Sequence, residues 1–162
     1  MLKVEEGKTN YGVRLISTEA IRRGQAFFTM QNYREVKVPT YQTIQVGTNR
    51  HIEELGVIAH LNHSCQPNVL VHIGRLACYA IRDINAGEEL NFFYPSTEWD
   101  MARPFDCQCG AAECVRRMAG ARHLSTQVLS RYFINEHIRA MVQEDLASTE
   151  RLFSGLQNPS AG

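Results

Sequence analysis

The sequence has no excess of charge of either sign. Its 162 residues include 17 lysines and arginines and 17 aspartates and glutamates. A protein that binds a nucleic-acid backbone or an anionic membrane through a broad electric field needs a basic excess. We therefore expect no direct nucleic-acid binding and no membrane binding, and specific recognition must come from a local site. The composition leaves the oligomeric state open.

Long apolar runs and an export signal are also absent. No run approaches the about 20 apolar residues that span a bilayer. The chain begins Met-Leu-Lys-Val-Glu-Glu, with acidic residues where a signal peptide would be basic and then apolar. We therefore predict a nuclear or cytoplasmic location.

Cysteine is scarce and odd in number. Five cysteines without an export signal do not suit a disulfide framework, so metal ligation is the better use for them. The chain of 162 residues is also long enough to bury a core as one domain without disulfides.

Most of the sequence is typical of short strands separated by glycine and proline. The expected strands span 12–16, 26–30, 35–38, 43–46, 69–73, 76–81 and 90–94. Helical spacing of apolar residues predicts one helix over 53–61 and another over 124–142, with Ser125 as a possible N-cap. The polar residues from 148 onward are expected to form a flexible tail. These features indicate a β-rich α+β protein.

The densest group of polar and reactive side chains lies between the first predicted helix and a strand, in Leu61-Asn62-His63-Ser64-Cys65-Gln66-Pro67-Asn68-Val69. Pro67 disfavours helical geometry at Gln66, so the chain must turn sharply here. The turn presents Asn62, His63 and Cys65 in different directions. Taken alone, the segment also fits an ordinary polar turn with a small buried cysteine.

Three of the cysteines, Cys107, Cys109 and Cys114, form a compact cluster. A structural zinc site takes four ligands. Cys65 in the polar turn is the natural fourth ligand, because Cys78 lies within an apolar strand and is expected in the core. We therefore predict a zinc site; the alternative is a set of reduced thiols without a metal.

Three motifs occur in order along the chain. They are Asn62-His63-Ser64-Cys65, Gly87-Glu88-Glu89-Leu90-Asn91-Phe92-Phe93-Tyr94, and Cys-x-Cys-x4-Cys over 107–114. With them the chain, over roughly 8–114, resembles the SET-domain methyltransferases with a post-SET zinc cluster. The resemblance implies a SET-domain fold of several small β-sheets with a pseudoknot-like active site, short helices and a C-terminal helix.

The resemblance also divides the chain. Residues 1–106 are the expected SET domain, 107–120 the post-SET zinc-binding segment, 121–147 a C-terminal helical extension and 148–162 the flexible tail. The walls of a substrate groove are expected in 33–48 and 96–103.

In that family the methyl donor is S-adenosylmethionine, and the resemblance implies which residues bind it. They are Tyr11, Gly12, Asn62 and His63. Asn10 stands where the family has a glycine, and asparagine tolerates a positive φ better than most residues. The expected cofactors are therefore S-adenosylmethionine and zinc.

The resemblance implies that Tyr94 is the catalytic tyrosine, whose hydroxyl helps to orient the methyl group and the target nitrogen. Phe92 occupies a position where the family has Phe or Tyr, and a phenylalanine leaves room for more than one methylation. Methyl transfer needs a neutral amine, and desolvation in an aromatic channel lowers the pKa of an amine.

The function that the resemblance implies is S-adenosylmethionine-dependent methylation of lysine in a protein or peptide, histone or non-histone. One alternative is a methyltransferase for a small-molecule amine or amino acid, which the lack of a basic surface signal for chromatin supports. A second alternative is a zinc-stabilised SET module that binds partners without catalysis.

Overall fold

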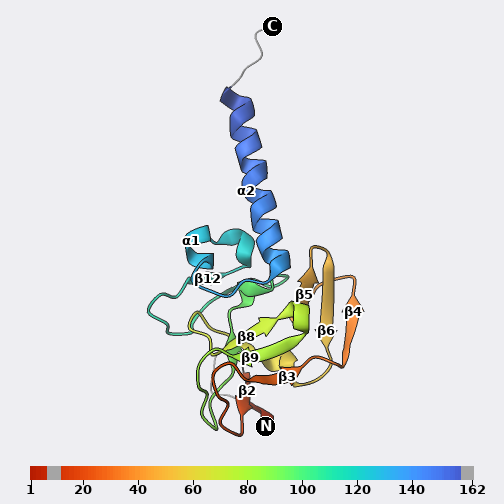
Figure 1. Ribbon diagram of the computed structural model, residues 1–162, viewed down its shortest axis with the longest axis vertical. Coiled ribbons are helices and arrows are strands. Elements are labelled where there is room, and N and C mark those ends of the chain that lie inside the picture. The colour runs from red at the N-terminus through yellow and green to blue at the C-terminus, as the bar shows by residue number, and fades with distance from the viewer. Residues whose placement is uncertain (7–11, 158–162) are drawn as a thin grey trace.

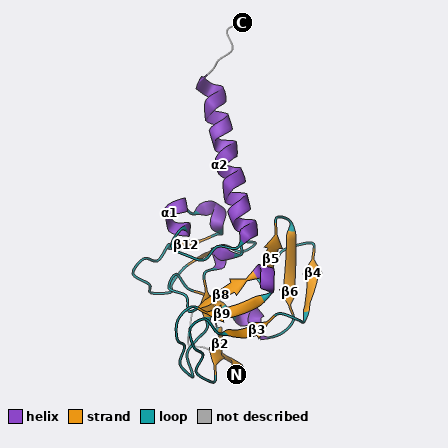
Figure 2. Cartoon of the chain, viewed as in Figure 1, coloured by secondary structure: helices purple, strands orange, loops and turns teal. Residues whose placement is uncertain are grey.

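The structure is a computed structural model that describes residues 1–6 and 12–157. Two positions discussed above, Asn10 and Tyr11, lie outside the described residues. Within the described ranges, short strands form four small sheets, and a long helix ends the chain (Figure 1). Figure 2 shows how much of the body consists of strands and loops.

The strands of the described residues are β1 (Leu2–Glu6), β2 (Val13–Ser17), β3 (Ala26–Thr29), β4 (Tyr33–Val36), β5 (Thr43–Gly47), β6 (Arg50–Glu54), β7 (Asn62–His63), β8 (Val69–His72), β9 (Ala77–Ala80), β10 (Asn91–Phe92), β11 (Phe105–Asp106) and β12 (Arg117–Met118). They pair as β1-β2, β3-β9-β8-β10-β7, β4-β6-β5 and β11-β12. The 3₁₀ turns are η1 (Val57–His60), η2 (Ile73–Arg75), η3 (Tyr94–Ser96) and η4 (Ala121–His123), and the helices are α1 (Thr126–Leu129) and α2 (Glu136–Gln157). The expected β-rich α+β architecture is confirmed.

The helix predicted over 53–61 is wrong. Arg50–Glu54 form strand β6, which pairs with both β4 and β5, and only Val57–His60 form a 3₁₀ turn. Strand alternation buries Ile52 and Glu54, whereas Leu55, which the helical pattern placed on the buried face, is 49% exposed. Pairing with two neighbouring strands overrides the helical spacing of the apolar residues.

The single helix predicted over 124–142 has the wrong bounds. Helix α1 ends at Leu129, and α2 begins only at Glu136. Ser125 caps α1 as predicted, because its hydroxyl oxygen accepts the N–H of Val128 at 3.3 Å. Two elements therefore replace one.

Helix α2 is longer than predicted. It continues through 148–157, which were predicted as part of a flexible tail, and it projects away from the sheets (Figure 1). Among the described residues, no helix combines the length and the apolar composition needed to cross a membrane.

Asn135 fixes the start of α2 against the sheets. Its side-chain NH₂ donates to the carbonyls of Val71 and Ser96, both at 2.9 Å, and its Oδ1 accepts the N–H of Ile73 at 2.9 Å. Asn135 is buried, so these bonds form without competition from water. They tie α2 to β8 and η3.

Strand β10 lies between β7 and β8, two strands that follow each other in the sequence. Asn91 and Phe92 pair in parallel with Asn62 and His63, and the N–H of Ser64 donates to the carbonyl of Phe92 at 3.1 Å. A late segment of the chain thus passes beside the turn that joins two earlier strands. This is the pseudoknot-like arrangement that was expected.

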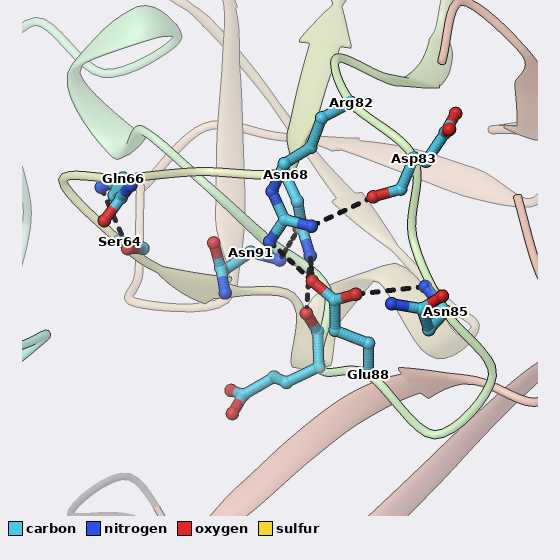
Figure 3. Close-up of polar contacts among 9 residues, drawn as sticks. Ser64, Gln66, Asn68, Arg82, Asp83, Asn85, Glu88 and Asn91 are labelled. Carbon is cyan, nitrogen blue, oxygen red and sulfur yellow. Dashed lines mark hydrogen bonds and ion pairs between the residues drawn. The ribbon is translucent and has the colours of Figure 1, made fainter. Parts of the chain in front are cut away.

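The side chain of Asn68 holds the inserted segment (Figure 3). Its NH₂ donates to the carbonyl of Glu89 at 2.8 Å and to the carboxylate of Glu88 at 3.2 Å, and its Oδ1 accepts the N–H of Asn91 at 2.9 Å. Arg82 pairs with the same Glu88 carboxylate at 2.5 Å. Because Asn68 is fully buried, its amide group needs these hydrogen bonds, which water cannot replace.

We predict that Asn68→Leu lowers the free energy of unfolding by about 3 kcal/mol or more, because a side chain of similar size leaves the Asn91 N–H and the Glu89 carbonyl without their partner. Denaturant unfolding followed by circular dichroism measures the change. Asn85→Leu, at an exposed position, is the matched control. An equal, small change in both variants would contradict the role of Asn68.

Candidate active site and metal centre

The inserted strand brings two distant residues to one point. Tyr94 follows β10 closely, and its backbone N–H donates to Nδ1 of His63 at 3.3 Å. The two rings make an edge contact, with centroids 5.2 Å apart. Tyr94 and His63 meet because β7 and β10 pair side by side.

The side chain of Tyr94 has a fixed direction. Its hydroxyl donates to the carbonyl oxygen of Leu61 at 3.0 Å. Its ring centroid lies 4.8 Å from that of Phe92 and 6.2 Å from that of Phe105. Aromatic neighbours and one directed hydrogen bond together limit how this phenol can move.

His63 links this point to the cysteines. Nδ1 accepts the Tyr94 N–H, so the ring proton lies on Nε2, which is 3.4 Å from Sγ of Cys65. Burial lowers the pKa of His63 to about 4, so the ring is neutral near pH 7. Both ring nitrogens therefore have partners within the chain.

The four predicted metal ligands, Cys65, Cys107, Cys109 and Cys114, come together, with all four Sγ atoms within 4.8 Å of one another. The Sγ atom of Cys65 is 3.9 Å from that of Cys107 and 4.0 Å from that of Cys114. A tetrahedral site with Zn–S bonds of about 2.3 Å places its sulfurs about 3.8 Å apart. The arrangement can hold one zinc ion. Cys78 lies fully buried in β9, in the core as predicted.

The cysteines of the cluster differ in pKa, because hydrogen bonds from the backbone favour the thiolate of one and burial disfavours the thiolate of another. Burial opposes ionisation of Cys109, but backbone N–H groups of Ala111 and Cys65 outweigh it and lower the pKa of Cys109 to about 7. Burial raises the pKa of Cys107 to about 12. A bound cation is therefore needed to hold all four sulfurs as thiolates, which is what zinc supplies.

A cavity of about 660 Å³ lies beside Tyr94. Its lining comes from Val13, Thr40–Ile44, Ile58–Asn62, Phe92, Tyr94, Glu98, Met101–Arg103, Phe105, Asp106 and Gln108. The parts within 40–44 and 98–103 belong to the segments that were expected to form the walls of a substrate groove. Aromatic faces, amides and charged groups of both signs thus border one space.

The cavity lies next to the start of β2. The Asn62 side-chain NH₂ donates to the carbonyl of Val13 at 2.8 Å and to the carboxylate of Glu89 at 2.9 Å. Gly12 has φ +74°, and among the described residues other than its chain neighbours no atom lies within 4 Å of the place that a Cβ would take there. The left-handed backbone at Gly12 favours glycine at this position, one residue before the carbonyl that Asn62 contacts.

Glu98 lies in a segment that was predicted as a groove wall, but the sequence did not single it out. It is half-buried, and its Oε1 accepts the backbone N–H of Gln45 at 2.9 Å and the hydroxyl of Thr97 at 3.1 Å. Burial raises the pKa of Glu98 to about 7, although both donors oppose the shift. A lone acidic residue in a loop carries no sequence signal, because its partner Gln45 lies on a distant strand.

The family profile described as SET domain matches residues 12–95, more than half of the chain. The chain belongs to the SET-domain family. Its members share a methyl-transfer fold, and this chain is a SET methyltransferase with the cysteine cluster that a post-SET zinc site requires.

Relatives of this SET domain include a protein named methyltransferase flvH from Aspergillus flavus. It is 35% identical over 143 residues, which are 87% of this chain and 80% of that protein. A histone-lysine N-methyltransferase, H3 lysine-4 specific, from Emericella nidulans is 30% identical over 106 residues, which are 59% of this chain but only 9% of that protein.

The SET domain also resembles solved structures. The crystal structure of KRYPTONITE in complex with mCHG DNA and SAH matches with a TM-score of 0.56 and 24% sequence identity. The match covers 72% of this chain and 28% of the solved one. This similarity confirms the SET fold.

Not all residues predicted for donor binding and catalysis in the SET domain line the cavity. Asn62, Phe92 and Tyr94 line the cavity. His63 is buried next to them with its ring between Tyr94 and a cysteine, and Tyr11 lies outside the described residues. The roles of these residues stay predictions.

We predict that Cys109→Ala lowers the zinc content from about one ion per chain to near zero and lowers Tm, because three thiolates leave the coordination incomplete. Mass spectrometry of metals and a thermal scan measure the two effects. Cys78→Ala is the matched control, since it removes a buried thiol outside the cluster and should keep the zinc. Equal zinc in both variants would argue against the site.

We predict that Glu98→Gln raises Tm, and that the gain grows with pH. The folded carboxyl has a pKa of about 7, above its value in the unfolded chain, so folding takes up a proton between the two values and wild-type stability falls as pH rises through that window. The gain should therefore increase from about pH 5 to about pH 7 and then level off. Scanning calorimetry across this range measures it; a gain that does not vary with pH would refute the account. Glu150→Gln, exposed on α2, should show no gain.

Proposed function

We propose that this SET domain is an S-adenosylmethionine-dependent N-methyltransferase for a lysine-type primary amine. The observation that carries the proposal is the position of Tyr94, whose hydroxyl is held by the Leu61 carbonyl and which lines the same cavity as Asn62. An aromatic cavity with one fixed phenol suits the alignment of an amine and a methyl group.

Binding of the donor is assigned to Gly12, Asn62 and His63, together with Tyr11. The amide of Asn62 and the aromatic faces near Tyr94 fit a nucleoside joined to a sulfonium cation, since cations bind well against aromatic rings. Because both ring nitrogens of His63 have partners within the chain, its contact to the donor would come from the backbone. Neighbours solved with SAH support binding of the donor by this fold.

The zinc ion is assigned to Cys65, Cys107, Cys109 and Cys114. Its role is structural: it ties the loop that contains 107–114 to the turn at Cys65, beside the active site. His63, hydrogen-bonded to the Cys65 sulfur, then has a fixed ring position.

When bound, S-adenosylmethionine supplies a methyl group on a positively charged sulfur. The residues of the chain exclude water around the amine, which lowers its pKa and favours the neutral form. Tyr94 orients the nitrogen, whose lone pair forms the new N–C bond while the C–S bond breaks and the sulfur keeps the electron pair. The proton that the amine loses goes to solvent. Phe92, with no hydroxyl to hold a water, leaves room for more than one methylation.

Relatives named as histone-lysine N-methyltransferases support lysine in a protein as a substrate, and they support action in the nucleus. A neighbour was solved with an H3(1-15) peptide, which supports a peptide-borne lysine. The division into a SET domain (1–106), a post-SET segment (107–120) and a helical extension from 121 remains part of the proposal.

The proposed activity is tested by incubating the zinc-loaded protein with donor labelled in the methyl group. Histone H3, cytosolic protein extract and free amines are the acceptors, and titration calorimetry measures donor binding. We expect donor binding and label transfer to at least one amine. Absence of both would overturn the proposal.

We predict that Tyr94→Phe lowers kcat on the order of 100-fold while donor affinity changes little, because the hydroxyl orients the reacting groups. Single-turnover kinetics and calorimetry separate the two quantities. Tyr79→Phe, in strand β9 away from the cavity, is the matched control. An unchanged kcat in Tyr94→Phe would contradict the proposed role of the Tyr94 hydroxyl, and the absence of methyl transfer by the wild-type protein would favour a non-catalytic binding module.

A further inference from the structure

The free edge of strand β5 lies at the cavity, where Thr43 and Ile44 are lining residues. An extended peptide binds to such an edge through the backbone N–H and C=O groups that the edge leaves free. Here the N–H of Gln45 donates to Glu98 at 2.9 Å, and the N–H of Thr43 donates to the carbonyl of Thr40 at 3.3 Å. Both donors have partners within the chain, so a peptide strand would have to displace them.

Glu98 lines the same cavity, and its carboxylate makes no ion pair among the described residues. Its Oε1 accepts two hydrogen bonds, whereas its Oε2 has no hydrogen-bond or ion-pair partner within residues 1–6 and 12–157. A half-buried carboxylate loses part of its hydration free energy when one of its oxygens has no partner. An ammonium group that binds this oxygen would offset the loss.

Arg103, an exposed residue, also lines the cavity, and its guanidinium group has no carboxylate partner among the described residues. It lies 5.7 Å from the centroid of the Tyr41 ring, and no ion pair or hydrogen bond of its side chain occurs in the described part of the chain. Asp106, which lines the same cavity, is engaged by Arg117 at 3.0 Å. The N–H groups of the Arg103 guanidinium are therefore available to bind the carboxylate of a ligand.

Two residues of opposite charge, neither of them in an ion pair within the described part of the chain, thus border the cavity that Tyr94 lines. Given the proposed function, we infer that the substrate is a small zwitterionic diamine, that is, a free diamino acid. Its α-ammonium group binds Glu98, its α-carboxylate binds Arg103, and its side-chain amine is the methylated group. A lysine inside a peptide carries neither charge on its α-carbon, so it would leave both protein groups without a partner.

The first test compares substrates on the wild-type protein. L-Lysine and L-ornithine are compared with cadaverine, which lacks the carboxylate, with 6-aminohexanoate, which lacks the α-ammonium, and with a lysine peptide blocked at both ends. We expect kcat/KM for a free diamino acid to exceed each of the other three by about tenfold or more, the value of one charge-assisted hydrogen bond.

The second test assigns each charge to a residue. Glu98→Gln should raise KM for the diamino acid about tenfold and change KM for 6-aminohexanoate little, because that compound has no α-ammonium. Arg103→Met should raise KM for the diamino acid and leave cadaverine unaffected. Arg22→Met and Glu150→Gln, both exposed and outside the cavity, are the matched controls. Since Glu98→Gln is expected to be more stable than wild type, unfolding does not explain its loss.

The outcomes separate this inference from the proposed function. Donor binding together with faster methylation of the blocked peptide would overturn the inference and leave the proposed function standing. So would equal KM values for the diamino acid in wild type, Glu98→Gln and Arg103→Met. Failure to bind donor and to methylate any amine would overturn the proposed function itself.

Discussion

The parallel insertion of β10 between β7 and β8 is the constraint on which the rest of the site depends. It places Tyr94 against His63, and it sets the direction of the Tyr94 hydroxyl through the Leu61 carbonyl. The buried side chain of Asn68 holds the inserted segment through hydrogen bonds that water cannot replace. Disruption of this pairing would remove the active site and part of the core together.

The cysteine cluster and the active site share one structural support. Cys65 belongs to the turn that β10 passes, and His63 lies two residues before it with its ring between Cys65 and Tyr94. A zinc ion at the four sulfurs would therefore fix more than the loop over 107–114. Through His63, the zinc ion would also fix the backbone of Tyr94, the first residue of η3 and the candidate catalytic residue.

Glu98 shows how stability and function oppose each other here. Its half-buried carboxylate destabilises the fold above the pH at which the unfolded chain ionises, yet it accepts a backbone N–H at the edge of β5 and places a negative charge on a residue that lines the cavity. A neutral residue at position 98 would make the folded protein more stable but would remove the negative charge. Such a cost is typical of a group kept for recognition.

The sequence by itself determined the family and the candidate residues for the chemistry, because those signals are local: the spacing of Cys107, Cys109 and Cys114 is that of a metal site, and the segments around His63 and Tyr94 are family motifs. It also predicted most strands, where alternation and glycine punctuation are local as well. Only the tertiary structure decided that 50–54 are a strand rather than a helix, that α2 continues to Gln157, and that Glu98 meets Gln45. These outcomes depend on partners distant along the chain, and the preferences of neighbouring residues do not contain that information.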